Sequence, residues 1–479
     1  MAQRQKQPDV LTPFMLPEPA APSGYSNIDP LDGRYYDAAI ARYLSEQSRI
    51  TYQAYVEAAL AHTLADYGVC SKSIADAIEH SARNITAQAV YEEERVTKHD
   101  VKALANCIKR GAPEDAHPFV HFGATSYDIV ATASALQMRD AVTNVVVPRL
   151  KELLTTLITL TETYAATTQI GRTHGQHALP VTFGFAMSEY VSRIGESMQA
   201  IASLAGELRG KFSGAVGAYN ALSMFVDKPL DFEAAIMARV GLEPAPYSTQ
   251  IVPPEAMVRL IDEMTIAAGI MANLAHDMRH LQRTEIAEVR ERFEKGQTGS
   301  STMALKRNPW NFENVVSMSK QVIAQSVNAN LNLSSEHQRD LTDSASARFY
   351  AIVPACVAGM AQRLNTVMGK LEVDAGAMER NLQLTGGAIA AEPFYLLLAK
   401  HGHPQAHETS KAIAHRAMGQ HQPLHEAIIA DPEGATYWAR FSPHEQAVLR
   451  QPELHYTGIA AAKAATIARH WKTIITRGQ

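Results

Sequence analysis

The stretch MVRLIDEMTIAAGIMANLAHDM, residues 257–278, repeats apolar side chains at steps of four and three. Side chains at this spacing lie on one face of an α-helix. The face is formed by Met257, Ile261, Met264, Ala268, Met271, Ala275 and Met278. The stretch therefore predicts a long helix with one buried face, and its alanines allow a second helix to approach closely.

Two further stripes extend this pattern toward the N-terminus. One consists of Ile194, Met198, Ile201, Ala205 and Leu208, and the other of Val146, Leu150, Leu153, Leu154 and Leu157. Pro148 either starts the helix of the second stripe or kinks it. Stripes of Met and Leu can line a cofactor, but far more often they form the core of a helix bundle, so these stripes predict a bundle core.

The rest of the chain contains no internal repeat, no low-complexity tract and no convincing run of paired strands. The sequence therefore predicts an all-α fold built around a central long-helix bundle. Long helices of this kind often pair with other chains, which favours a homo-oligomer. The predicted division is a mobile, proline-containing extension at 1–24, an N-terminal helical domain at 25–119, the bundle at 120–376 and a C-terminal helical domain at 377–479.

Composition excludes several classes of function. With 44 Lys and Arg against 49 Asp and Glu, the formal net charge of −5 gives no electrostatic signature of nucleic-acid or anionic-membrane binding. No apolar run is long enough to cross a bilayer, and the N-terminus lacks the apolar core of a secretion signal. The only cysteines, Cys70, Cys107 and Cys356, are widely spaced. We therefore expect a cytoplasmic protein without a structural metal or a cofactor.

Two polar clusters lie beside predicted helix starts or turns, where free backbone N–H groups bind anions. In HFGATSYD, residues 121–128, Thr125 and Ser126 either bind a ligand or simply cap a helix. In GRTHGQHALP, residues 171–180, His174 is a candidate proton donor next to Thr173. A metal pair of His174 with His177 is the alternative, but no third ligand lies nearby.

Two more clusters combine hydroxyls with cations. GQTGSSTMALKRNP, residues 296–309, places Ser300, Ser301 and Lys306 on a glycine-rich loop, as either a carboxylate trap with a reactive serine or a flexible loop. HQRDLTDSASARFY, residues 337–350, spaces polar residues so that they fall on about one helical face. This face either binds phosphate or is a solvated ion-pair surface with Asp340 and Asp343; its polar residues are Arg339, Ser344 and Arg348.

Together these motifs resemble the adenylosuccinate lyase branch of the fumarase/aspartase superfamily. GSSTMALKRNP is similar to the superfamily signature GSS-x-M-P-x-K-x-N-P, and the branch is indicated by GRTHGQHALPVTFG, HFGATSYDI, TKHDV, PLDGRY, STQI, RDLTDS, TGGAIAAE and PELHYTG. The likeness runs from about residue 25 to the C-terminus. It implies an all-helical, three-domain subunit of a homotetramer whose active sites collect loops from three subunits.

The resemblance also implies an activity in purine biosynthesis. The expected reactions are elimination of fumarate from adenylosuccinate, giving AMP, and from the succinyl-aminoimidazole carboxamide ribotide SAICAR. By carry-over Ser300 is the general base and His174 the general acid. The residues expected to bind substrate are Arg34, Tyr35, Lys98, His99, Asp100, His121, Thr125, Ser126, Thr173, Gln250, Ser301, Lys306, Arg307, Asn308, Asn314, Arg339, Ser344 and Arg348.

Some positions depart from the family pattern, and two rival functions remain. Ala304 replaces the signature proline, and His337 stands where a tryptophan is expected. One rival is a sister lyase acting on argininosuccinate or aspartate, or a carboxymuconate cycloisomerase; the paired arginines favour a phosphorylated substrate instead. The other rival is a non-catalytic helical assembly protein, against which Ser300, His174, Lys306 and Asn308 together argue.

Overall fold

The computed structural model describes residues 11–12, 14–16, 29–293, 303 and 306–477. The chain divides into two compact units. Unit 1 comprises residues 1–150, 197–269 and 317–361, and unit 2 comprises residues 151–196, 270–316 and 362–479. The unit boundaries fall inside the long helices, which are α7 (Val147–Thr163), α8 (Phe183–Gly206), α10 (Glu255–Leu281), α11 (Trp310–Leu331) and α12 (Ile352–Met368).

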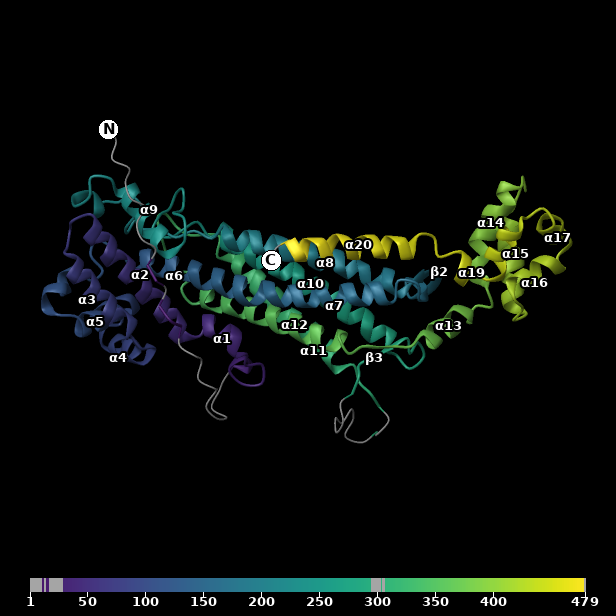
Figure 1. Ribbon diagram of the computed structural model, residues 1–479, viewed down its shortest axis with the longest axis horizontal. Coiled ribbons are helices and arrows are strands. Elements are labelled where there is room, and N and C mark those ends of the chain that lie inside the picture. The colour runs from purple at the N-terminus through teal and green to yellow at the C-terminus, as the bar shows by residue number, and fades with distance from the viewer. Residues whose placement is uncertain (1–10, 13, 17–28, 294–302, 304–305, 478–479) are drawn as a thin grey trace. The chain divides into compact units, whose positions relative to one another are not determined.

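Besides its parts of the helices that cross the unit boundaries, unit 1 contains a further group of helices (Figure 1). They are α1 (Ala38–Leu44), α2 (Glu46–Asp66), α3 (Lys72–Arg83), α4 (Ala87–Thr97), α5 (Asp100–Gly111), α6 (Ser126–Ala141) and α9 (Pro229–Val240), with single turns at Pro30–Asp32, Glu114–Phe119, Leu222–Met224 and Ser346–Ala351. Hydroxyl side chains define several helix starts, since those of Ser45, Ser71 and Thr86 accept a backbone N–H from the first turn of α2, α3 and α4. The buried helix α2 packs against α3, α6 and α9.

The predicted stripes form the core, as expected. The apolar residues of the stripes on α7, α8 and α10 are buried, except that Met257 is half-buried. Between α6 and α7 the helix passes through a π segment, Val142–Val146, in which the N–H of Val147 donates to the carbonyl of Val142. Pro148, which has no N–H to donate, follows this segment as the second residue of α7.

Unit 2 contains paired strands, contrary to the expectation from the sequence. Strands β1 (Thr168–Thr173) and β2 (Gln176–Thr182) form an antiparallel hairpin, and β3 (Val289–Arg290) pairs with β4 (Glu372–Val373). The hairpin was missed because its residues do not alternate between apolar and polar, and strand formation depends strongly on tertiary surroundings. The fold class remains all-α, with these short pairs as additions.

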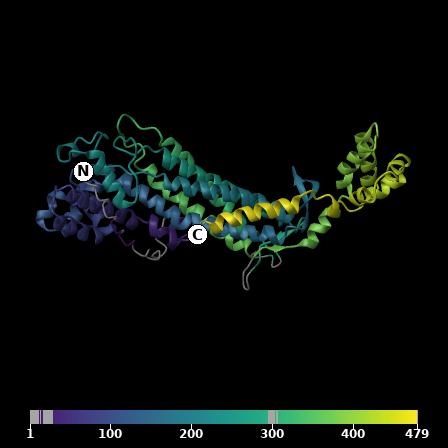
Figure 2. The ribbon, with the colours of Figure 1, turned by 45° about the horizontal axis from the view of Figure 1, so that its top comes forward.

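The remaining helices of unit 2 follow in chain order. They are α13 (Ala375–Gln383), α14 (Ala391–Lys400), α15 (Ala406–Gly419), α16 (Leu424–Ala430), α17 (Pro432–Trp438), α18 (Pro443–Arg450), α19 (Pro452–His455) and α20 (Ala460–Arg477), with a turn at Ala388–Ala390. Phe394, Leu398, Ile413 and Leu424 share a core within α14–α18, which group together in Figure 1 and Figure 2. Gly195 of α8 lets Trp471 of α20 pack closely, because an added Cβ would lie 2.6 Å from the ring.

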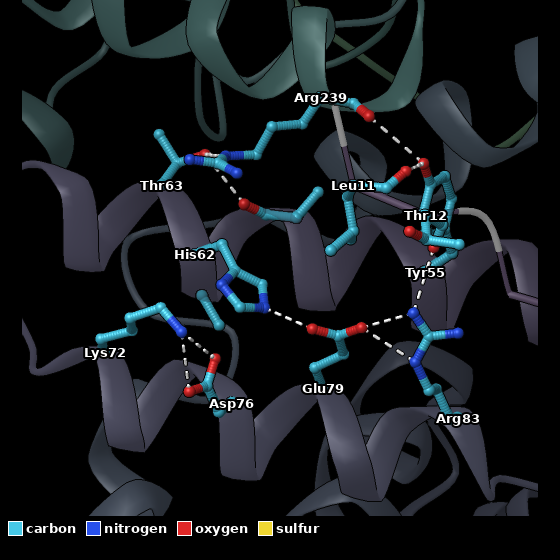
Figure 3. Close-up of polar contacts among 12 residues, drawn as sticks. Leu11, Thr12, Tyr55, His62, Thr63, Lys72, Asp76, Glu79, Arg83 and Arg239 are labelled. Carbon is cyan, nitrogen blue, oxygen red and sulfur yellow. Dashed lines mark hydrogen bonds and ion pairs between the residues drawn. The ribbon is translucent and has the colours of Figure 1, made fainter. Parts of the chain in front are cut away.

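Part of the N-terminal extension is packed, unlike the mobile segment that we expected. Leu11 and Phe14 are 9% and 7% exposed. The Phe14 ring meets the Tyr55 ring edge-on at 5.3 Å and lies 4.3 Å from the Arg83 guanidinium. Arg83 also donates to the carbonyl of Thr12 at 3.1 Å (Figure 3). These residues therefore attach the extension to α2 and α3. The three-domain division itself remains a prediction.

No single helix in the described ranges has the length and apolar composition needed to cross a membrane. Only a pair bent by 70°, α13 with Ala388–Lys400, passes that test, and it does so by length and composition alone.

Candidate active site

Two helix N-termini meet in unit 1. Helix α5 begins after His99, whose Nδ1 accepts the N–H of Lys102 at 3.3 Å. Helix α6 begins after Thr125, whose N–H donates to the Asp128 carboxylate at 2.8 Å. Across the two starts, Nε2 of His99 lies 3.4 Å from Oγ of Ser126. Because both helices direct the positive ends of their dipoles to this place, it favours an anionic ligand.

Asp128 fixes the start of α6. Its Oδ1 accepts hydrogen bonds from the Lys211 ammonium and from the N–H groups of Ser213 at 3.1 Å and Gly214 at 3.2 Å. The side chains of Asp128 and Lys211 are both fully buried. A buried ion pair with this many hydrogen bonds is held in one geometry, so the neighbouring Thr125 and Ser126 are positioned rigidly.

The arginine segment does not form the predicted helical face. Residues 337–345 are turns and bends, and Arg348 lies in the 3-10 turn Ser346–Ala351. The reason is local: Asp340 accepts from the N–H groups of Glu336 at 2.6 Å and Thr342 at 2.8 Å, which competes with helix formation. Hydrogen bonds from Thr342 lower the pKa of Asp340 to about 2. The prediction that Arg339, Ser344 and Arg348 share one helical face is therefore wrong.

The two arginines differ in their surroundings. Arg339 is 6% exposed, contacts Asp343 at 2.7 Å, donates to the Tyr127 hydroxyl at 2.5 Å and lies 4.2 Å from the centre of the Tyr127 ring. Arg348 is 51% exposed and reaches Asp100 only at 3.7 Å. Arg348 is thus accessible to a ligand beside the start of α5, whereas protein side chains already surround Arg339.

The other residues of unit 1 that the sequence predicted for the site lie outside the contacts between His99, Ser126 and their neighbours at the starts of α5 and α6. The N–H of Gln250 donates to the carbonyl of Gln338 at 3.2 Å, next to Arg339. His121 contacts the buried Glu57 at 2.7 Å. The contacts above do not include Arg34, Tyr35, Lys98 or Ser344: Arg34, Lys98 and Ser344 are exposed, and the N–H of Tyr35 donates to Pro30 at 2.9 Å.

In unit 2, His174 occupies the tip of the β1–β2 hairpin. His174 and Gly175 form the two-residue loop, with φ of 54° and 73°, and Thr173 pairs with Gln176 on either side. Positive φ at both loop positions is the pattern of a type I′ turn, which matches the twist of a hairpin. His174 and Thr173 are exposed there. His177 instead lies on β2, where burial and the nearby Arg172 lower its pKa.

A buried carboxylate holds the base of this hairpin. Glu288 accepts from Arg172 at 2.5 and 3.2 Å, from Gln169 at 2.7 Å and from Asn381 of α13 at 2.7 Å. The motif residue Arg172 is therefore turned to the protein interior. Sequence reasoning missed Glu288, which lies more than a hundred positions from Arg172 in the chain.

Ser300 and Ser301 lie outside the described residues. Lys306 and Arg307 are exposed, and the Arg307 carbonyl accepts from Gln282 at 3.1 Å. Asn308 and Asn314, half-buried, lie just before α11 and within its first turns. The start of α11 is capped by Glu291, which accepts the N–H groups of Asn311 and Phe312. Within the described ranges, no group of three His, Cys, Asp or Glu residues could hold a metal ion.

Comparison with known protein families gives two matches that together cover most of the chain. Residues 33–324 match a family described as "Lyase", and residues 335–433 match "Adenylosuccinate lyase C-terminal". The adenylosuccinate lyase of Pyrococcus abyssi is 34% identical over 418 residues, covering 86% of this chain and 91% of that protein. The adenylosuccinate lyase of Methanocaldococcus jannaschii is 30% identical over 443 residues, covering 90% and 94%.

Solved structures show the same fold. The 3-carboxy-cis,cis-muconate lactonizing enzyme of Pseudomonas putida is similar with a TM-score of 0.82 and 27% identity, covering 93% of this chain and 100% of that one. A fumarate lyase of Mesorhizobium sp. BNC1 is similar with a TM-score of 0.81 at 23% identity, covering 91% and 98%.

The all-α fold and the lyase family match define the class: the protein is a carbon–nitrogen lyase of the fumarase/aspartase superfamily. Within that superfamily, the chain belongs to the adenylosuccinate lyase family. Neither of the rival functions, a sister lyase or an assembly protein, is favoured by these relatives, because the match to adenylosuccinate lyases extends over most of the chain.

Proposed function

We propose that the protein releases fumarate from adenylosuccinate, giving AMP, and from SAICAR in the same pathway of purine synthesis. Beyond family membership, one observation supports this: the starts of α5 and α6 meet at His99 and Ser126, beside the accessible Arg348. Both substrates are polyanions that carry a phosphate and two carboxylates. Helix N-termini and an arginine fork are suited to such groups.

The chemistry requires a base and an acid. Ser300 removes a proton from the carbon beside one succinyl carboxylate, the carbon–carbon double bond of fumarate forms and the carbon–nitrogen bond breaks. Negative charge grows on the carboxylate during the proton transfer, and Lys306 and Asn308, with Ser301, are assigned to stabilise it. His174 donates a proton to the departing nitrogen. Its exposed position at the tip of a hairpin suits a group that must reach a bound substrate.

The other substrate-binding assignments follow the chemistry of each group. Thr125, Ser126 and Thr173 are assigned to the succinyl carboxylates. The phosphate and ribose end is assigned to Arg348 and its neighbours, with Arg339 as support because Asp343 and Tyr127 already engage its guanidinium. The remaining assignments, proposed as substrate contacts, are Arg34, Tyr35, Lys98, His99, Asp100, His121, Gln250, Arg307, Asn314 and Ser344.

We also propose that the chain forms a homotetramer that shares active-site loops between subunits. In unit 1, Ile323, Val327 and Leu331 follow each other at steps of four along α11 and are 49%, 58% and 73% exposed. An apolar stripe of this kind on a long helix is typical of a surface that packs against another chain. The three cysteines are free, in keeping with the proposed cytoplasmic location.

The test is an absorbance assay with adenylosuccinate, SAICAR and argininosuccinate in separate reactions, with fumarate measured in each. We expect fumarate from the first two and none from the third. Ser300→Ala and His174→Ala should nearly abolish turnover while the assembled protein stays folded. Fumarate from argininosuccinate alone would refute the substrate assignment, and fumarate from none of the three would refute the activity.

A further inference from the structure

A buried glutamate on α2 contacts the loop that leads into α6. The Glu57 side chain is fully buried, and its Oε1 lies 2.7 Å from Nδ1 of His121. Its second oxygen, Oε2, is buried without a hydrogen-bond partner among the residues that the structure describes. A buried carboxylate that is bonded at only one oxygen requires a positive partner, and His121 is the group in contact with it.

The backbone of His121 is in an unusual conformation. Its φ is 61°, in the left-handed region that residues other than glycine seldom adopt. Its carbonyl accepts the N–H of Ala124 at 3.4 Å, so His121 opens the turn that ends at Thr125 and α6. Strained conformations persist when surrounding contacts hold them, and they concentrate at functional sites. The bond from Glu57 is such a contact.

The charges around His121 come from three helices. Glu57 belongs to α2, Lys102 to the first turn of α5 and Asp128 to the first turn of α6, where Lys211 already neutralises it. Burial lowers the pKa of His121, but the charge and hydrogen bond of Glu57 outweigh this, and the pKa is raised above its usual range. His121 therefore lies beside the starts of both helices and tends to carry a proton.

We infer that Glu57 is a positioning residue for substrate binding: through Nδ1 it orients His121 and keeps it cationic, so that Nε2–H is offered to an anionic group bound where α5 and α6 begin. Because Nδ1 and Nε2 lie on opposite sides of the ring, a hydrogen bond donated by Nδ1–H to Glu57 leaves Nε2–H free to donate elsewhere. His121 is 23% exposed, enough for contact with a ligand. The inference rests on the proposed function, which supplies that anion.

A second histidine–glutamate pair in the same unit provides a matched control. His62 of α2 contacts Glu79 of α3 at 2.5 Å, but Glu79 also accepts from Arg83 at 2.8 Å (Figure 3). An arginine therefore meets the charge of Glu79, whereas His121 alone meets that of Glu57 in the described structure. Glu79 has no assigned part in substrate binding. Its substitution therefore tests whether the loss of any glutamate that contacts a histidine of unit 1 changes KM.

The decisive variant is Glu57→Gln, because its amide oxygen still accepts from Nδ1–H while the charge is lost. At pH 8 we expect KM for adenylosuccinate to rise about tenfold, the loss of one charge-assisted contact, with kcat within about twofold. As the pH is lowered the difference in KM should narrow, since a higher proton concentration increasingly protonates His121 in the variant as well. Glu57→Asp, which retains the charge, should restore part of the affinity, and Glu79→Gln should leave KM unchanged at each pH.

Two results would overturn the inference: equal KM for Glu57→Gln and wild type at pH 8, or a loss of activity that is independent of pH and parallels a loss of stability. If the variant does not fold, histidine-labelled wild-type protein can be titrated by NMR with and without inorganic phosphate. We expect the His121 signal to titrate above the ordinary range and to move when phosphate is added; a signal that does neither would also overturn the inference. Failure of the proposed function is recognised separately, as wild-type protein that releases no fumarate.

Discussion

Ser126 and His99 lie 3.4 Å apart, measured from Oγ to Nε2, although Ser126 is the first residue of α6 and His99 is the N-cap of α5. The contact brings two positive helix ends together at one place. Arg348 approaches the same place through Asp100, at 3.7 Å. At the proposed ligand site of unit 1, the positive ends of two helix dipoles therefore act together with the side chain of Arg348.

Arg348→Ala should weaken substrate binding more than it affects folding. Its ion pair with Asp100 is long and partly exposed, so the free energy of unfolding should change by less than about 1 kcal/mol. Loss of a charged phosphate contact, worth about 1.5–3 kcal/mol, should raise KM by roughly 10–100-fold with little change in kcat. Steady-state kinetics measures this. Arg416→Ala, at a half-exposed arginine paired with Asp431, is the control and should leave KM unaltered.

Lys211→Met should destabilise unit 1 strongly. The substitution leaves the Asp128 carboxylate buried without its cation, although the N–H groups of Ser213 and Gly214 remain. Breaking a buried pair in this way costs about 3–5 kcal/mol. Urea unfolding monitored by circular dichroism would measure the loss. A variant as stable as the wild type would show that the backbone N–H groups alone compensate the carboxylate.

His174→Asn should abolish proton donation while leaving the stability of the β1–β2 hairpin intact. Asparagine tolerates positive φ and is preferred before glycine in type I′ turns, so the melting temperature should be kept or slightly raised. Asparagine has no proton to donate as a general acid, so kcat should fall by roughly 10²–10⁴-fold. Thermal unfolding and turnover are measured on the same preparation. Retained turnover would remove His174 from the role of acid.

The Glu57–His121 pair should make stability depend on pH in a defined direction. The pKa of His121 is raised in the folded protein, so the pair contributes fully below the unfolded value of about 6.5 and its contribution is lost as pH rises through the folded value. The stability of wild type relative to Glu57→Gln should therefore fall from pH 6 to pH 9. Urea unfolding at three values of pH tests this, and a difference that grows with pH would contradict it.

Phe14→Ala should release the N-terminal segment from α2 and α3. Phe14 is 7% exposed and contacts Tyr55 and Arg83, so its loss should cost up to roughly 1.5–3 kcal/mol. Limited proteolysis should then cleave within residues 11–16 faster than in the wild type. Met15→Ala is the control, because Met15 is 92% exposed. Equal cleavage of both variants would mean that Phe14 does not hold the segment.

Helical periodicity was sufficient to predict the core, because the stripes on α8 and α10 repeat over many turns and a single buried face explains them. It could not predict the β1–β2 hairpin, whose residues do not alternate and whose Arg172 contacts Glu288 from another part of the chain. Nor could it predict the turns around Asp340, where a short side chain binds nearby N–H groups and ends helical structure.

In the candidate site, too, some residues could be predicted from the sequence and others could not. His174, Ser126 and Arg348 could be named from local motifs because each lies in a characteristic short sequence. Glu57 and Lys211 could not, since they are 64 and 83 positions away from the residues that they hold. Such partners carry no local signal: a glutamate within an apolar helix is visible in the sequence, but its contact is defined only when the chain has folded.

The side chain of Tyr55 contacts both the N-terminal segment and a much later part of the chain. Its hydroxyl lies 3.0 Å from the carbonyl of Leu11 and 3.2 Å from that of Arg239, 184 residues further on (Figure 3). During translation Leu11 leaves the ribosome early, whereas the last part of α9 is made only after most of unit 1 has emerged. The complete surface that receives the segment does not exist until then. Leu11 and Tyr55 therefore reach their complete set of contacts only after Arg239 has been made.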